Sequence, residues 1–185
     1  MRKGMEIITV AAAVLSMILA VSCAPKEPVA SSYAEDRALI EDLQARYLFA
    51  LDSFDLDTYV STFTEDGILD IVEYQVRGRD AIRKSLEESR PVFDPSSENA
   101  EGPYRPTSRH NITNIVIKVD GDKAVGRAYW FHYGNNNPER RAELDAYGHY
   151  EDEMVKVNGQ WLFSKRVIYN ESVAEWIAPP GNPSW

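Results

Sequence analysis

The end of the first predicted helix reads Ala45-Arg-Tyr-Leu-Phe-Ala-Leu-Asp-Ser-Phe-Asp-Leu-Asp57 and holds two candidate functional residues, Tyr47 and Asp52. Around it, an apolar residue recurs at every fourth position, at Leu39, Leu43, Tyr47 and Leu51. This spacing predicts an amphipathic helix over Ala38–Leu51. Asp52 follows the apolar stripe directly, where a carboxylate meets the negative end of the helix dipole and is unfavourable without a partner.

The candidate partner of Asp52 is His110, which begins the first long β-run after a proline-rich segment. A carboxylate that orients a histidine, with the histidine as general base, is a common catalytic pair. Each of the two residues also has a structural interpretation without a catalytic role. Asp52 is then a helix-end residue or the cap of the next helix, and His110 is a strand histidine bonded to a backbone carbonyl. The deciding observation is whether the two side chains meet inside an apolar pocket.

The N-terminus has the features of a secretory leader. Arg2 and Lys3 precede an apolar run from Ile7 to Val21, and the small residues before Cys23 resemble the lipobox of bacterial lipoproteins. We therefore predict a signal peptide over residues 1–22, acylation of Cys23, and a tether over residues 23–32. The expected location is the bacterial cell envelope, lipid-anchored or periplasmic. An uncleaved N-terminal anchor is the alternative.

Composition limits the partners and cofactors of the protein. The 185 residues carry a formal net charge of −9, which argues against a nucleic-acid partner. Cys23 is the single cysteine, so no intrachain disulfide forms. No histidine or carboxylate spacing supports a metal site, and we expect no cofactor. Membrane contact is expected through the lipid anchor alone.

The remaining chain predicts one domain over residues 33–178, followed by a short tail over residues 179–185. Its first half predicts a helix over Asp55–Phe63, a turn at Glu65–Gly67, a strand over Ile68–Tyr74 and a third helix from Arg77 to about Glu88. The segment Pro91–Arg109 contains four prolines and has no periodicity, which is typical of a functional lid or a disordered excursion.

The second half predicts four strands, over Ile112–Val119, Ala124–Tyr133, Ala146–Val157 and Trp161–Asn170. Asp-Gly and Asn-Gly pairs mark tight turns within the first and last pairs of strands. Helices followed by a meander indicate an α+β fold, with three N-terminal helices packed on a strongly curved antiparallel sheet.

This order of elements resembles the nuclear-transport-factor-2-like superfamily in its SnoaL-like branch, which forms a cone-shaped α+β barrel. The resemblance covers Ala38 to about Tyr169. The motifs that carry it are Arg46-Tyr47-x4-Asp52, Phe63-Thr-Glu-Asp66-x3-Asp70, Gly78-Arg-Asp-Ala-Ile82, Arg109-His110-x3-Asn114, Tyr150-Glu-Asp152 and Gly159-Gln-Trp161. The fold hosts isomerases, dehydratases, cyclases, hydrolases and binding modules, so the fold alone does not name the function.

The resemblance implies a catalytic set of Tyr47, Asp52 and His110. Asp52 with His110 is similar to the pair of scytalone dehydratase, and Tyr47 five residues before Asp52 resembles bile-acid 7α-dehydratase. It implies a cofactor-independent dehydratase that eliminates water from a small hydrophobic substrate, a hydroxylated ring compound such as a hydroxy-keto steroid or a polyketide. Two alternatives stay open: a ketosteroid-type isomerase with Asp52 as base, and a lipid-anchored small-molecule binding module without chemistry.

Five further residues are candidate substrate contacts. Tyr74 replaces a tyrosine of the dehydratases if its strand turns it toward the pocket. His132 and His149 either line the pocket or are ordinary sheet histidines, and Arg166 and Tyr169 either hold a polar substrate tail or are surface residues. Tyr47 also has a core interpretation, because it shares the buried stripe with Leu43 and Leu51. Five helical residues rotate by roughly 140°, so Tyr47 and Asp52 are not expected on one face of the helix. Aromatic residues in the tail close the pocket mouth or contact a second subunit of a homo-oligomer.

Overall fold

The computed structural model describes residues 32–71, 74–93 and 107–173. The predicted leader, Cys23, most of the tether and of the proline-rich segment, and the tail lie outside the described residues. Within the described ranges, no helix is long and apolar enough to cross a membrane.

The long first helix, α2, spans Tyr33–Ser53 and confirms the predicted helix, with an additional turn at its start. Ser32 caps it by accepting a hydrogen bond from the backbone N–H of Glu35 at 3.2 Å. It ends at Phe54, whose φ of 56° is left-handed. The buried stripe differs from the predicted one at one position, because Leu39 is 39% exposed and Ile40 is buried in its place.

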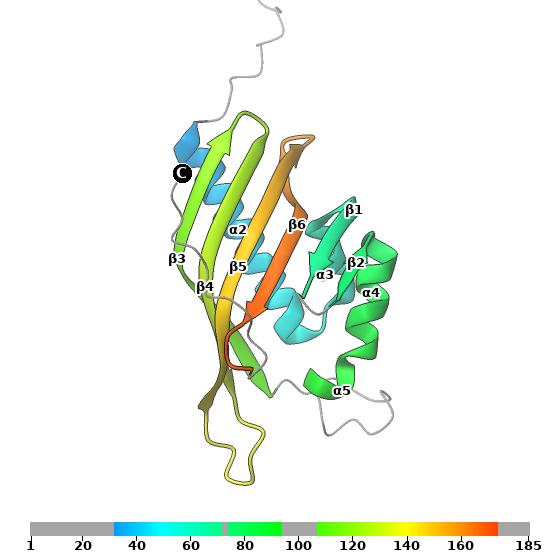
Figure 1. Cartoon of the computed structure of the whole chain (residues 1–185), viewed down its shortest axis with the longest axis vertical. Helices are drawn as coiled ribbons and strands as arrows, with labels where there is room; N and C mark the ends of the chain where they lie inside the picture. The colour runs from blue at the N-terminus through cyan, green and yellow to red at the C-terminus, as the bar shows by residue number, and fades with distance from the viewer. Residues whose placement is uncertain (1–31, 72–73, 94–106, 174–185) are drawn as a thin grey trace, which may run out of the picture. The chain divides into compact units, whose positions relative to one another are not determined.

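Three shorter helices follow, α3 (Leu56–Ser61), α4 (Arg79–Glu88) and α5 (Arg90–Phe93). Asp55 caps α3 as expected, since its carboxylate accepts the backbone N–H of Thr58 at 3.1 Å. Figure 1 shows α2 lying across one face of the sheet, with α4 alongside strand β2 (Gln75–Arg77). The sequence predicted neither α5 nor β2.

The predicted turn at Glu65–Gly67 is wrong. Strand β1 runs through it, from Phe63 to Asp70, with an irregularity in its pairing between Phe63 and Ile68. Gly67 permits this path because a Cβ there would lie 2.9 Å from the Cβ of Phe63. The missing side chain therefore lets the strand bend on itself where the local sequence indicates a turn.

The four later strands match the prediction closely, as β3 (Ser108–Asp120), β4 (Lys123–Gly134), β5 (Glu143–Val157) and β6 (Gln160–Asn170). They form a six-stranded sheet in the order β2-β1-β6-β5-β4-β3. The predicted α+β fold is confirmed, with one difference: β1 pairs parallel with β6, so the sheet is mixed. Strand β3 bends at a bulge near Asn114, whose φ is 54°.

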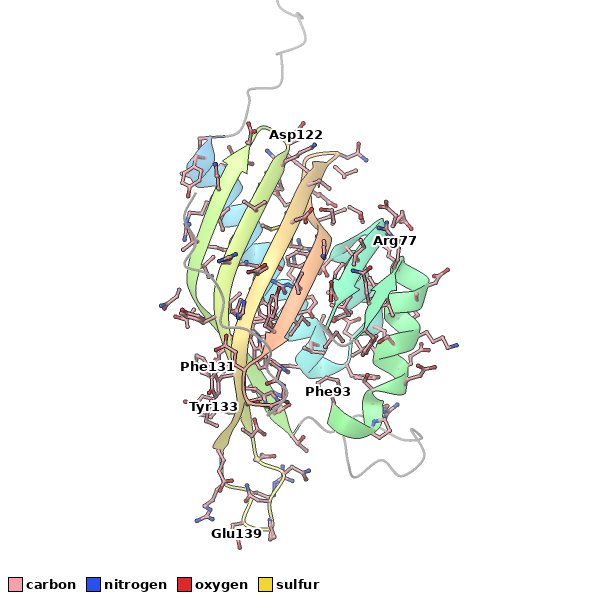
Figure 2. All side chains as sticks on the ribbon, in the orientation of Figure 1. Arg77, Phe93, Asp122, Phe131, Tyr133 and Glu139 are labelled. Carbon is pink, nitrogen blue, oxygen red and sulfur yellow. The ribbon has the colours of Figure 1, made fainter. Side chains whose placement is uncertain are left out.

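The core lies between α2 and the sheet and is rich in aromatic side chains, among them Tyr47, Tyr59, Phe63, Trp161 and Phe163. The β4–β5 loop with Glu139 extends beyond the sheet at the end opposite the β3–β4 turn with Asp122 (Figure 2). Figure 2 also places Phe93 toward the Glu139 end.

Candidate active site

Asp52 and His110 meet. The His110 Nδ1 lies 2.7 Å from the Asp52 Oδ1, and the backbone N–H of His110 donates to Oδ2 at 3.0 Å and to Oδ1 at 3.2 Å. The two side chains are only 9% and 11% exposed. The end of α2 thus finds its partner at the start of β3. Because Nδ1 faces a carboxylate, we assign the proton of the neutral ring to Nδ1, which leaves Nε2 as an acceptor.

The ring of His110 lines a cavity of about 180 Å³. Most of its lining is apolar, including Leu51, Leu69, Ile71, Phe93, Trp130 and Ile168. Asp52 lies behind His110 and lines a separate surface groove with Arg46 and Arg109. The histidine therefore faces the cavity and the aspartate supports it from outside.

Tyr47 lines the same cavity from α2 and is fully buried. Its hydroxyl lies 2.8 Å from the hydroxyl of Tyr59, and burial raises the pKa of both phenols. As the helical rotation predicts, Tyr47 and Asp52 occupy different faces of α2, and only Tyr47 is among the residues that line the cavity. Tyr47 is thus both a core residue and part of the cavity wall, and its catalytic role stays a prediction.

Tyr74 lies at the cavity rim. It is 46% exposed, and its hydroxyl lies 3.0 Å from the Oγ of Ser85 on α4. The chain therefore turns Tyr74 toward the pocket, which was the condition for its role as a substrate contact.

His132 packs against His110 without being one of the cavity-lining residues. The ring centroids are 4.5 Å apart, and Asp145 bonds the Nδ1 of His132. Burial lowers the pKa of His132, and a charge on His110 lowers it further, while Asp145 opposes both effects. Two imidazoles, each held by a carboxylate, thus lie side by side at one end of the site.

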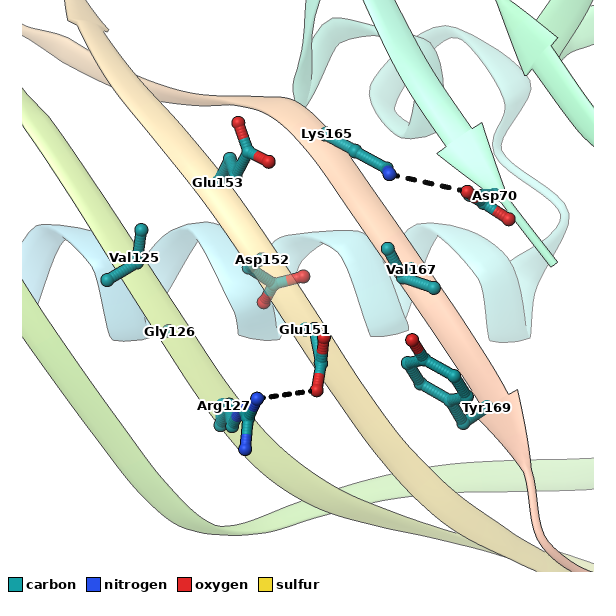
Figure 3. A pocket seen from close by; sticks show the side chains of 10 residues that line it. All are labelled: Asp70, Val125, Gly126, Arg127, Glu151, Asp152, Glu153, Lys165, Val167 and Tyr169. Atoms are coloured by element: carbon teal, nitrogen blue, oxygen red, sulfur yellow. Dashed lines mark ion pairs between the residues drawn. The ribbon is translucent and has the colours of Figure 1, made fainter. Parts of the chain in front are cut away.

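His149 and Tyr169 lie elsewhere. Their rings stack at 4.3 Å, and the His149 Nδ1 lies 2.7 Å from a carboxylate oxygen of Glu171. Figure 3 shows Tyr169 on the face of the sheet turned away from α2, in a second pocket that contains the ion pairs Arg127–Glu151 and Lys165–Asp70. His149 is therefore a sheet histidine that is bonded to Glu171, and neither His149 nor Tyr169 lines the cavity of His110.

The surface interpretation of Arg166 is wrong, because this side chain is fully buried. Its guanidinium binds Asp152 through two hydrogen bonds of 2.8 Å and lies 4.0 to 4.3 Å from the ring centres of Tyr47, Tyr150 and Phe163. Burial alone lowers the pKa of Arg166, but the charge and hydrogen bonds of Asp152, together with Tyr47 and Tyr150, raise the pKa above its usual value, so the group stays charged. Arg166 is not among the cavity-lining residues and supports the tyrosines from behind.

Sequence reasoning missed two of the tyrosines that line the cavity, Tyr59 and Tyr150. Strand alternation places Tyr150 on the same face as Gly148 and Asp152, but alternation alone does not show that this face lines the cavity. Within the described ranges, no group of three or more histidine, cysteine, aspartate or glutamate side chains is arranged to hold a metal ion.

Solved structures similar to this chain share the fold. A protein called "Putative Scytalone Dehydratase" from Novosphingobium aromaticivorans is 27% identical, with 80% of this chain and 92% of that chain covered and a TM-score of 0.60. A protein of unknown function from Mycobacterium tuberculosis is 25% identical over 75% and 73% of the two chains, with a TM-score of 0.62. A nuclear-transport-factor-2-like protein with a cystatin-like fold, also from Novosphingobium aromaticivorans, is 20% identical over 94% and 96%, with a TM-score of 0.61.

No curated protein matches the chain. The SnoaL-like domain family matches residues 32–167, which include all six strands apart from the last residues of β6. This family includes cyclases, dehydratases and isomerases. From the length of this match and the shared architecture, the chain belongs to the SnoaL-like domain family.

Proposed function

We propose that the protein is a cofactor-free dehydratase that removes water from a hydroxylated ring compound carrying a carbonyl group. The observation that carries this proposal is the Asp52–His110 pair, with the histidine ring in the wall of an apolar cavity. A positioned imidazole beside an apolar binding site is the minimal equipment for taking a proton from a carbon acid.

The size of the cavity narrows the substrate class. Its volume of about 180 Å³ is close to that of an apolar cavity of ~150 Å³ that accepts benzene. We infer that one six-membered ring of the substrate enters, and that any larger steroid or polyketide skeleton extends from it toward the rim. The apolar walls favour such a ring, and Tyr74 at the rim is placed to contact the rest.

In the proposed reaction, Nε2 of His110 removes the proton from the carbon next to the carbonyl. The electron pair of that C–H bond forms an enolate, whose collapse breaks the bond to the hydroxyl on the β-carbon. The proton on His110 then passes to the departing hydroxyl, giving water and an α,β-unsaturated carbonyl compound. Asp52 holds the ring in one tautomer and stabilises the imidazolium that forms.

The placement of Asp52 favours dehydration by His110 over isomerisation by Asp52. The carboxylate already accepts both the ring and the backbone N–H of His110, and it is not among the cavity-lining residues. A base must reach within hydrogen-bond distance of the proton it takes. The position of His110 in the cavity wall supports its assignment as the base. The relative named as a scytalone dehydratase, 27% identical to this chain, adds support for a dehydratase.

The test is incubation with a panel of β-hydroxy ketones, from β-hydroxycyclohexanone to hydroxy-keto steroids, following loss of the mass of one water. We expect turnover by the wild type and a loss on the order of 10²–10⁴-fold in His110→Ala. Asn111→Ala is the matched control, because Asn111 is the next residue of β3 and, by strand alternation, points to the other face. Tight binding of these ketones without turnover of any of them would instead identify a binding module.

A further inference from the structure

Four tyrosines line the cavity, and three of them have hydroxyl partners. The hydroxyls of Tyr47 and Tyr59 bond each other, and that of Tyr74 bonds Ser85. The fourth, Tyr150 on β5, is only 2% exposed, and its hydroxyl has no hydrogen-bond partner in the described part of the chain. The hydroxyl is not one of the fully buried, unpartnered polar atoms of the described residues, so it keeps accessible surface where Tyr150 lines the cavity. A hydroxyl in this position can bond a ligand in the cavity without breaking a hydrogen bond of the protein.

The surroundings of Tyr150 fix its ring and favour its role as a donor. Its ring stacks on that of Trp130, with centroids 6.0 Å apart and planes inclined by 26°. The Arg166 guanidinium lies 4.2 Å from the ring centre on the core side. Burial holds the pKa of Tyr150 well above its usual value, so the phenol keeps its proton throughout the neutral range.

Trp130 connects Tyr150 to the catalytic pair. Its ring centroid lies 6.2 Å from that of His110 and 6.0 Å from that of Tyr150. Along the sheet, Trp130 is paired with Gly148, and His132, which packs against His110, is paired with Ala146. Tyr150 follows Gly148 by two residues, so Tyr150 and His110 lie on opposite sides of Trp130 along the strands. A flat ring resting on the indole therefore has one edge toward His110 and the other toward the Tyr150 hydroxyl.

We propose that Tyr150 is the residue that binds the carbonyl oxygen of the ligand, donating its O–H to that oxygen. In the reaction proposed above, this hydrogen bond strengthens as the C–H electron pair moves to the oxygen and the enolate forms. No proton leaves Tyr150, because His110 both takes the α-carbon proton and returns it to the departing hydroxyl. A donor placed where charge develops stabilises the transition state more than the ground state.

The hydrogen bond from Tyr150 to a ligand carbonyl can be tested without any catalytic turnover. Cyclohexenone labelled with carbon isotope at the carbonyl is bound to the full chain, and its carbonyl stretch is followed by difference infrared spectroscopy. We expect a shift to lower frequency in the wild type, because a hydrogen bond weakens the C=O bond. Tyr150→Phe should remove most of that shift. This variant keeps the ring and deletes only a hydroxyl without a partner, so we expect its thermal unfolding to match the wild type.

Two further variants make the test specific. Tyr129→Phe is the matched control, because Tyr129 is 50% exposed on the neighbouring strand and its hydroxyl should not affect the shift. Tyr47→Phe tests the rival donor. A wild-type shift that survives in Tyr150→Phe, or a shift lost in Tyr47→Phe alone, overturns the proposal, and so does the absence of any shift in the wild type.

The role of Tyr150 in stabilising the enolate rests on the proposed dehydratase function, and it is measured in a separate experiment. On any β-hydroxy ketone that the wild type dehydrates, Tyr150→Phe should lower kcat on the order of 10²–10³-fold, the usual loss for one oxyanion donor. If no ketone is dehydrated but the infrared shift depends on Tyr150, the dehydratase proposal fails and the carbonyl site stands. If ketones are dehydrated at an unchanged rate by Tyr150→Phe, the assignment of Tyr150 fails and the dehydratase stands.

Discussion

At the residue scale, Asp52 serves two purposes. Its carboxylate accepts the backbone N–H that opens β3 and also holds the His110 ring. The same residue therefore connects α2 to the sheet and defines the base. A deletion of this carboxylate leaves a partly buried N–H without an acceptor, which costs roughly 1–3 kcal/mol of stability. The activity of an Asp52 variant must therefore be compared with a measurement of its folding.

The first prediction concerns this pair. Residues that act as one catalytic unit lose activity non-additively, so Asp52→Ala, His110→Ala and the double variant should be about equally impaired. Asp52→Asn should also be poor, because the amide can select the wrong imidazole tautomer. Steady-state rates on a dehydrated ketone, with circular dichroism to verify folding, measure this. A much larger defect for Asp52→Ala than for His110→Ala would instead favour an isomerase with Asp52 as base.

The second prediction concerns Arg166 and Asp152. Both side chains are fully buried, so removal of one charge leaves the other unpaired in the core. Arg166→Met should lower the free energy of unfolding by about 3–5 kcal/mol. The double variant with Asp152→Leu should recover a large part of this loss, because it removes the orphaned charge as well. Urea denaturation of the three proteins measures the difference, and equal stability of the single and double variants would contradict it.

The third prediction concerns pH. The pKa of His132 is lowered in the folded state, by burial and by His110, against the opposing pull of Asp145 and Asp52. An unfolded histidine takes its proton near pH ~6.5. As the pH falls through that value, the unfolded chain therefore binds a proton that folded His132 does not, and stability decreases.

His132→Gln should lessen this loss. Urea midpoints compared at pH ~7.5 and pH ~5.5 should fall less in the variant than in the wild type. An equal fall in the two proteins would show that another group carries the acid sensitivity.

At the element scale, the closeness of β4, β5 and β6 shapes the cavity. Gly148 on β5 lies opposite Trp130 on β4, and the indole N–H of Trp130 donates to the carbonyl oxygen of Tyr169 on β6 at 3.1 Å. The Trp130 indole therefore passes over Gly148 and reaches β6. A side chain on β5 at this point would occupy the space that lets Trp130 form the cavity wall.

The fourth prediction follows from this packing. A Cβ on Gly148 would lie 1.8 Å from the Tyr169 carbonyl oxygen and 3.1 Å from the Trp130 ring. Gly148→Ala should therefore cost at least the roughly 1–3 kcal/mol of an overpacked core and weaken ketone binding. Gly126→Ala is the control, because its nearest neighbour is the flexible end of Met154. Chemical denaturation and ligand titration measure both variants, and equal behaviour of the two would contradict the packing argument.

At the scale of the whole molecule, the folded domain carries the candidate site, and the predicted leader concerns the location of the protein. The apolar leader and the motif before Cys23 lead us to propose a lipid-anchored envelope protein, although Cys23 lies outside the described residues. A protein anchored in this way would encounter, at the membrane surface, a hydrophobic substrate that partitions into the membrane.

The fifth prediction tests that anchor. Wild-type protein expressed with its leader should fractionate with membranes, and Cys23→Ser should move to the soluble fraction, because acyl chains supply the membrane affinity. Identical fractionation of the two proteins would show that Cys23 is not acylated.

The sequence by itself determined the elements whose signals are local. The helical period around Tyr47, the cap at Asp55 and the Asp-Gly and Asn-Gly turns predicted α2, α3 and the strands β3 to β6 to within a few residues. Helix caps and tight turns are specified by neighbouring residues, so one sequence suffices to find them. The spacing of Asp52 and His110, read through the family resemblance, also identified the pair that the structure brings together.

Only the tertiary structure decided which face of each element is buried and what meets there. Gly67 sits in a strand because distant β6 pairs with β1, and Arg166 is buried because Asp152 and three aromatic rings surround it. Tyr150 was missed for the same reason: alternation along a strand gives two faces, and contacts from elements far away in the sequence select the one that lines the cavity.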